Sequence, residues 1–297
     1  MGIIGLARWI NAPTTGVNKI RENLEANHQG VQRGRWILSL GSYRSTLSTS
    51  PAMRIPERVM YTVTMGDNVF VVLEDPTSPT RAELAQAASD SQPGQSSPTP
   101  PPHWRNTLVT VSPPGALEQL LGQLRARWVS VRQPGASSAG QRSQGIGMAQ
   151  QQLTIDGYIY SIGNDWLVRF GHVKLAGGAP KGMLIEVEYL PLPVLQTIAV
   201  DGASELLANI LISMLPMTPD AKIVGVNVED AIWEEVLGGL DDDVDDEVEK
   251  SEEDADGDIF VLPDVMPKPR KGDWIGMDRD RRSAYMIVGA LRQEGLI

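Results

Sequence analysis

The sequence predicts an α+β fold, an antiparallel β-barrel-like sheet with flanking helices and long disordered insertions. Several segments alternate apolar and polar residues with a period of two, which is typical of strands with one buried face. Short turns rich in Gly, Asn and Asp join these segments into hairpins. Helical patterns separate groups of strands and do not alternate with single strands. This order argues against a doubly wound parallel sheet and favours an antiparallel one.

The first half of the chain begins with a predicted strand at 2–10 and a helix that ends near Asn27 and is capped by Thr14 or Thr15. Further strands are predicted at 35–44, 58–65, 69–74 and 107–111, and Gly66-Asp67-Asn68 forms a hairpin turn between the second and third of these. A helix is predicted from Pro113 to about Val129. Its expected buried face carries Leu117, Leu120, Leu121, Leu124 and Trp128.

The second half holds the clearest strand patterns. Strands at 152–162, 166–175 and 182–190 form a predicted antiparallel meander. A leucine-rich helix at about 202–215 follows, and Pro216 ends it. Residues 216–272 look irregular apart from a short helix in VEDAIWEEVL. A C-terminal helix is expected at about 278–293.

We expect one domain over residues 1–297, interrupted by disordered insertions at about 76–103, 133–147 and 238–258. The first two are rich in Ser, Pro, Gln, Ala and Gly and bury too little apolar surface to offset their ordering entropy. The tract at 241–258 holds twelve carboxylates and one lysine, a net charge of −11. The remainder has 25 acidic and 25 basic residues, which argues against strong, salt-dependent nucleic-acid binding.

Motifs for catalysis are missing from the sequence. It has no cysteine, and His28, His103 and His172 are too far apart to form a zinc-binding pair. It has no phosphate-binding glycine loop and no nucleophile elbow. We therefore predict no catalytic, cofactor-binding or metal-binding residues and interpret His172 as structural. No apolar run approaches the roughly 20 residues that span a bilayer, so we expect a soluble, intracellular protein.

The strand GMLIEVEYL places Glu186 and Glu188 on one face, opposite Met183, Ile185 and Val187. In tunnel-shaped barrels, alternate inward glutamates bind a divalent metal against a polyphosphate. A tunnel-type triphosphate hydrolase that uses Glu186 and Glu188 is therefore one hypothesis. Against it, Leu190 stands where such strands carry a third charged residue, and no second strand of this kind exists. The favoured interpretation is that both glutamates face solvent or a partner.

The stretch WLVRFGHVKLAGGAPKGMLIEVEYLP resembles the Mediator subunit 20 family, from the head module of the transcriptional Mediator complex. The shared features are a strand ending in a V..G.V pattern, a glycine-containing turn, and a strand reading G..IEVEY. A leucine-rich helix, ELLANILISML, then follows. The resemblance is good over about residues 153–215 and weak elsewhere. It does not cover 76–103 or 217–272.

This resemblance implies a nuclear, non-enzymatic coactivator subunit with a barrel-like fold that regulates RNA polymerase II transcription. It implies a heterodimer with Mediator subunit 18, attachment through subunit 8 and contact with TATA-binding protein. We expect the strands of 153–175 to lie near the partner surface. The predicted interface residues are Trp166, Phe170, Tyr158 and Tyr160.

Overall fold

The structure is a computed structural model, and it describes residues 3–46, 56–89, 101–124, 128–131, 153–175, 178, 180–191, 205–225, 232, 235–236 and 276–297. The strands are β1 (Ile3–Trp9), β2 (Val31–Ser45), β3 (Val59–Met65), β4 (Asn68–Glu74), β5 (Asn106–Val111), β6 (Trp128–Ser130), β7 (Leu153–Ile162), β8 (Trp166–Lys174), β9 (Pro180–Tyr189) and β10 (Ala221–Gly225). The helices described in full are α1 (Gly16–Asn27), α2 (Arg81–Ser89), α3 (Gly115–Gln123), α4 (Glu205–Met214) and α7 (Gly276–Gln293).

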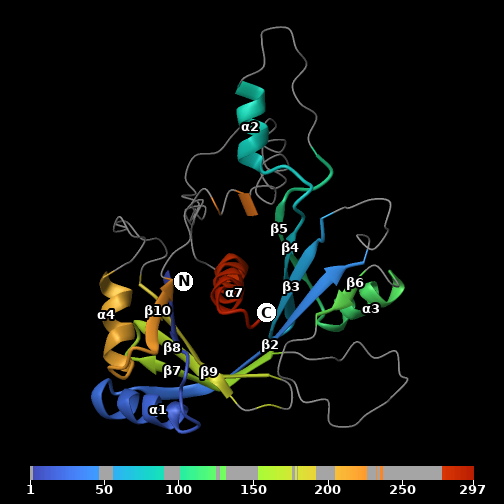
Figure 1. The fold of residues 1–297 in the computed structure, drawn as a ribbon. Helices are drawn as coiled ribbons and strands as arrows, with labels where there is room; N and C mark the ends of the chain where they lie inside the picture. Colours follow the sequence, from blue (N-terminus) through green and yellow to red (C-terminus); the bar gives the residue numbers. More distant parts are fainter. Residues whose placement is uncertain are drawn as a thin grey trace, which may run out of the picture.

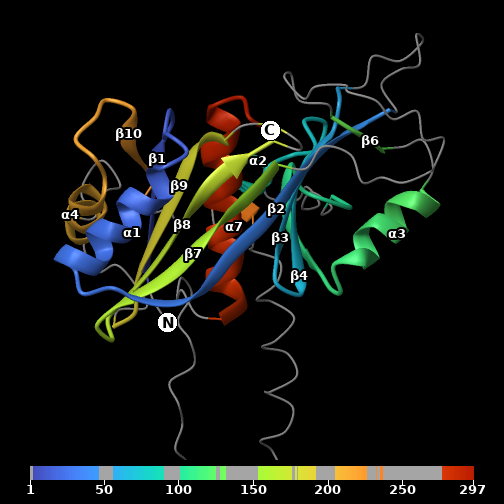
Figure 2. The same cartoon turned by 90° about the horizontal axis from the view of Figure 1, so that it is seen from below.

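All ten strands belong to one antiparallel sheet in the order β10-β1-β9-β8-β7-β2-β3-β4-β5, with β6 paired to the end of β2. The sheet curves around α7, and its two end strands, β10 and β5, both contact this helix (Figure 1). Helices α1 and α4 lie outside one arm of the sheet, and α3 lies outside the other (Figure 2). The predicted α+β class and barrel-like antiparallel sheet are confirmed.

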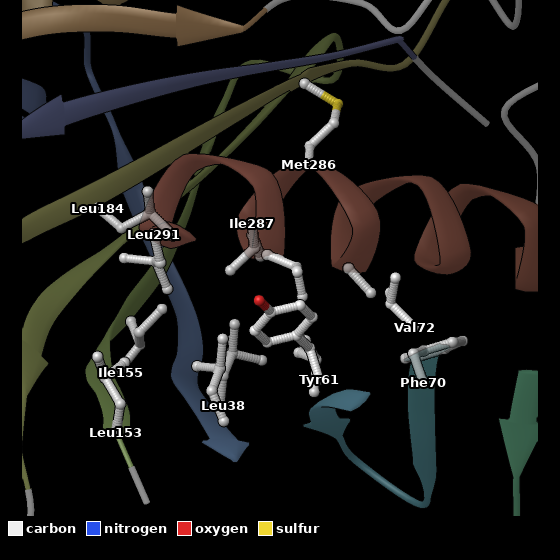
Figure 3. Close-up of a cluster of buried hydrophobic side chains, with 14 of the residues drawn as sticks. Leu38, Tyr61, Phe70, Val72, Leu153, Ile155, Leu184, Met286, Ile287 and Leu291 are labelled. Carbon is white, nitrogen blue, oxygen red and sulfur yellow. The ribbon is translucent and has the colours of Figure 1, made fainter. Parts of the chain in front are cut away.

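The core is divided by the sheet. On the inner face, α7 packs Ile287 and Leu291 against side chains of β2, β3, β4, β7 and β9 (Figure 3). On the outer face, α1 and α4 pack against β1, β8 and β9, while Leu117 and Leu121 of α3 cover β4 and the end of β2. Strand β9 is therefore buried on both faces, by α7 on the inner face and by the cluster that includes α1 and α4 on the outer face.

Gly182, the first glycine of the GMLIEVEY motif, allows β9 to pass close to the end of β1. Its φ is 111°, a conformation that L side chains rarely adopt. A Cβ atom at this position would lie 2.3 Å from the carbonyl oxygen of Ile10. The motif therefore begins with glycine because the backbone leaves no room for any other residue.

The prediction of a disordered loop over 76–103 is wrong for the part that forms α2. Helix α2 begins with a capping box: the amide of Glu83 donates to the hydroxyl of Thr80 at 3.0 Å, and the amide of Thr80 donates to the carboxylate of Glu83 at 2.9 Å. This reciprocal pair satisfies two amide donors that a short helix otherwise leaves open. The insertions expected at 133–147 and 238–258 lie outside the described residues.

The predicted helix from Pro113 to Val129 is too long. Helix α3 ends at Gln123, and Trp128 lies on β6, where it pairs with Ser45 of β2. Leu120 and Leu124, expected to be buried, are exposed. Pairing with β2 overrides the helical pattern here, because β-branched Val129 and aromatic Trp128 suit a strand. Strand β10 was also missed, within a segment that looked irregular, and the expected C-terminal helix is present as α7.

Candidate functional site

The interpretation that Glu186 and Glu188 face solvent or a partner is wrong. Both carboxylates lie on the inner face of β9 and are almost fully buried, with 1% and 3% of their surface exposed. Met183, Ile185 and Val187 point to the outer face, toward the cluster that includes α1 and α4. The period of two was interpreted correctly, but α7 covers the face that was expected to be open.

Two arginines hold these carboxylates between the sheet and α7. Nη1 of Arg169, on β8, lies 2.7 Å from Glu186 and 2.8 Å from Glu188. Nη2 of Arg279, on α7, lies 2.8 Å from each of the same two carboxylates. The hydroxyl of Ser283, one turn further along α7, donates a hydrogen bond to Glu186. We call these five residues the inner charge cluster.

The charges of the inner charge cluster keep Glu186 ionised in spite of its burial. Removal from water by itself raises the pKa of a carboxyl group. Here the guanidinium groups of Arg279 and Arg169 and the hydroxyl of Ser283 outweigh burial, so the pKa of Glu186 lies below its ordinary value. The two carboxylates in turn raise the pKa of Arg279. The cluster therefore sets two carboxylates against two guanidinium groups.

A second buried ion pair joins the sheet to the other end of α7, with the charges exchanged. Arg8 of β1 is fully buried, and its Nη2 lies 2.6 Å from the carboxylate of Glu294, just beyond the helix. Arg8 also donates to the carbonyl oxygens of Met183 and Lys181. The helix thus brings a cation to the glutamates at its first turn and an anion to an arginine at its end. A reversed helix would place like charges together at both ends.

This arrangement determines what Glu186 and Glu188 can do chemically. Their oxygens already accept from Arg169 of β8 and from Arg279 and Ser283 of α7, so α7 covers the side of the sheet that they face. Across the described part of the chain, no three His, Asp or Glu side chains come together so as to hold a metal ion. No local pattern indicates the cluster, because Arg279 is far from β9 along the chain.

The four predicted interface residues come together on the outer face of β7 and β8, but only two of them reach the surface. Tyr160 and Phe170 are fully buried, with ring centroids 5.6 Å apart. Burial and the hydrogen bond from the Tyr160 hydroxyl to Glu25 raise the pKa of Tyr160 to about 12. Trp166 and Tyr158 are half-buried. Tyr160 and Phe170 therefore belong to the buried cluster that includes α1 and α4, and Tyr158 and Trp166 lie at its margin.

A protein-family model matches residues 9–225. The family is described as the TATA-binding related factor (TRF) of subunit 20 of the Mediator complex. The chain belongs to the Mediator subunit 20 family. The match includes nine of the ten strands in full and Trp9 of β1, together with α1 to α4. The resemblance read from the G..IEVEY strand is confirmed.

Two solved structures that align with most of this chain have low sequence identity to it. A conserved hypothetical protein from Pyrococcus furiosus has 5% identity and a TM-score of 0.35, over 74% of this chain and 94% of that chain. A putative adenylyl cyclase from Hippeastrum, described as having a dominant triphosphatase activity, has 9% identity and a TM-score of 0.32, over 72% and 88%. No curated protein sequence matches.

Membership in the Mediator subunit 20 family defines the class of protein. The family is a non-catalytic component of Mediator, so the chain has a nuclear role in RNA polymerase II transcription and other Mediator subunits are its partners. The alternative hypothesis of a tunnel-type triphosphate hydrolase is therefore wrong. Within the described residues, no helix is both long and apolar enough to cross a membrane.

Proposed function

We propose that this protein is a head-module subunit of Mediator that forms a heterodimer with the related barrel-like subunit 18. In this proposal, subunit 8 attaches the pair to the rest of the head module, and TATA-binding protein is a further contact. The observation that carries the proposal is the family match over residues 9–225. We further propose that residues 1–297 form a single domain of this type.

The structure is consistent with a role as a rigid docking partner. Ion pairs at both ends of α7 connect the C-terminal helix to β1, β8 and β9, so distant parts of the chain form one packed body. Such a body presents fixed surfaces, and preorganised surfaces lose less entropy on association. We propose that the partner surface lies near β7 and β8, where Trp166 and Tyr158 keep exposed surface beside the buried Tyr160 and Phe170.

Co-expression with Mediator subunit 18 from the same organism, followed by size-exclusion chromatography, tests the proposal. We expect a single peak with the two chains in equal amounts, which light scattering would identify as a heterodimer. Co-expression with subunit 8 alone is the matched control, because subunit 8 is proposed to act on the assembled pair. Separate peaks for two well-folded chains would overturn the proposed pairing, although membership in the Mediator family would stand.

A further inference from the structure

We propose that an uncovered strip on the outer face of β2, β7 and β8 is the docking surface for a protein partner whose carboxylates surround an apolar socket. The strip consists of Arg35, Ile37, Asp156, Tyr158 and Lys174, and we call it the outer strip. This inference rests on the proposed function, because the partner is taken to be another subunit of the Mediator head module. It adds where that partner binds and which chemistry it presents.

The outer strip is a part of the outer face that the described helices leave open. The cluster that includes α1 and α4 covers β1, β8, β9 and the part of β7 around Tyr160, and α3 covers β4 and the end of β2. Figure 2 shows β7 and β2 in front of α7, with α1 on one side, α3 on the other and no described helix over them. A partner could therefore approach these strands from outside without moving any described helix.

An apolar side chain lies at the centre of the outer strip. Ile37 is 61% exposed, more than any other large apolar residue in the described strands. It lies directly across from Asp156 of β7 in the sheet, and Arg35 lies across from Tyr158. An exposed apolar residue within a ring of polar groups is the usual anatomy of a protein interface, in which Arg and Tyr are also enriched. Ile37 is the natural anchor for an apolar socket.

The polar groups around Ile37 are already held in place. The guanidinium of Arg35 stands 4.8 Å from the centre of the Tyr158 ring and forms an ion pair with Asp156. Nζ of Lys174 lies 3.0 Å from the other oxygen of the same carboxylate. Side chains that are ordered before association lose less freedom when a partner binds. The rim is thus prepared for contact.

The charge of the rim indicates what the partner presents. Arg35 and Lys174 share the single carboxylate of Asp156, so the outer strip carries one positive charge in excess. Both cations keep exposed surface, 51% for Arg35 and 37% for Lys174. Charged groups at the rim of an interface match charges of opposite sign on the partner. The partner should therefore place one or more carboxylates beside an apolar socket for Ile37.

The first test compares Ile37→Asp with Val109→Asp, using the full chain co-expressed with Mediator subunits 18 and 8. Val109 is a matched control, because it is also an exposed apolar strand residue and lies on β5, at the end of the sheet. We expect Ile37→Asp to weaken association by about tenfold or more, as for an interface anchor, and Val109→Asp to leave it unchanged. Circular dichroism melting curves would verify that both variants fold.

The outcomes separate this inference from the proposed function. If the wild-type chain does not associate with either subunit, the proposed function fails and the inference falls with it. If the wild type associates and Ile37→Asp binds equally well, the inference is overturned while the proposed function stands. Equal losses in both variants would also overturn it, since the effect would then not belong to the outer strip.

A second test uses charge and does not depend on Ile37. Lys174→Gln removes a cation from the rim and should weaken association and reduce its dependence on salt. Asp156→Asn removes the carboxylate that Arg35 and Lys174 share and increases the excess positive charge, so it should raise the association rate and increase its dependence on salt. If Asp156→Asn weakens binding as much as Lys174→Gln does, the predicted acidic partner is excluded.

Discussion

The two faces of β9 are equally buried but are built from opposite kinds of side chain. The outer face packs Met183, Ile185 and Val187 against apolar residues that include those of α1 and α4. The inner face places Glu186 and Glu188 against Arg169 and Arg279, between the sheet and α7. The two faces are therefore buried to the same extent, but substitutions on them should change the stability of the chain in different ways.

Apolar packing is tolerant of orientation, whereas paired charges are not. An apolar helix face can slide or reverse with moderate loss, because dispersion and hydrophobic contacts have little directionality. Buried ion pairs add little net stability, because desolvation offsets much of their attraction. Their removal one partner at a time is nevertheless costly. We infer that the outer face supplies most of the stability and that the inner charges fix the direction and register of α7.

The largest effect is expected for a charge introduced on the outer face. Phe170→Asp places an unpaired carboxylate in a fully buried apolar cluster, and we expect a loss of about 4 kcal/mol or more, enough to unfold a marginally stable chain. Trp166→Asp, on the same strand but half-buried, should fold and instead weaken subunit pairing. Solubility and urea denaturation measure the first change, and co-purification measures the second. A stably folded Phe170→Asp variant would contradict the assignment of this face to the core.

The next largest effect is expected when one member of the inner charge cluster is removed. Arg279→Met keeps the aliphatic part of the side chain but leaves Glu186 and Glu188 with the guanidinium of Arg169 and the hydroxyl of Ser283, at a cost of about 3–5 kcal/mol. The matched control on the same helix is Arg281→Met, which removes an ion pair with the exposed Asp278 and a hydrogen bond to Thr110 and should cost about 1–2 kcal/mol. Urea denaturation of both variants measures the difference. Equal losses would show that burial of the cluster has no energetic consequence.

A smaller effect, the coupling between Arg8 and Glu294, tests whether ion pairs set the direction of α7. Arg8→Glu and Glu294→Arg each place like charges together in a buried site, and both should destabilise the chain. The double exchange restores opposite charges and should recover about 1–3 kcal/mol relative to the sum of the single changes. Recovery will be incomplete, because a glutamate cannot replace the hydrogen bonds that Arg8 donates to Met183 and Lys181. Strictly additive losses would argue against a directional role.

The sequence was sufficient for the outer face and insufficient for the inner one. Alternation in GMLIEVEYL located β9 and its outward apolar residues, and the same local pattern located β3, β4, β7 and β8. Local patterns cannot indicate what covers a face. Whether Glu186 meets water or Arg279 depends on a helix far along the chain, and only tertiary structure brings the two together. The capping box of Thr80 and Glu83 was a local signal for α2 that the surrounding composition obscured.

The smallest effect concerns how steeply the stability of the chain declines as the pH falls. The pKa of Glu186 is lowered from its ordinary value of 4.5, so its contribution to stability is present above that value and is lost as the pH falls through the folded-state pKa. Glu186→Gln should therefore flatten the decline in stability between neutral pH and pH values below 4.5. Val109→Ala changes no titrating group and should keep the slope of the wild type. Urea denaturation at a series of pH values measures both. The stability of Glu186→Gln should decline less steeply than that of the wild type. An equally steep decline would show that the charge of Glu186 adds nothing to stability, and that ion pairs with α7 do not stabilise the inner face.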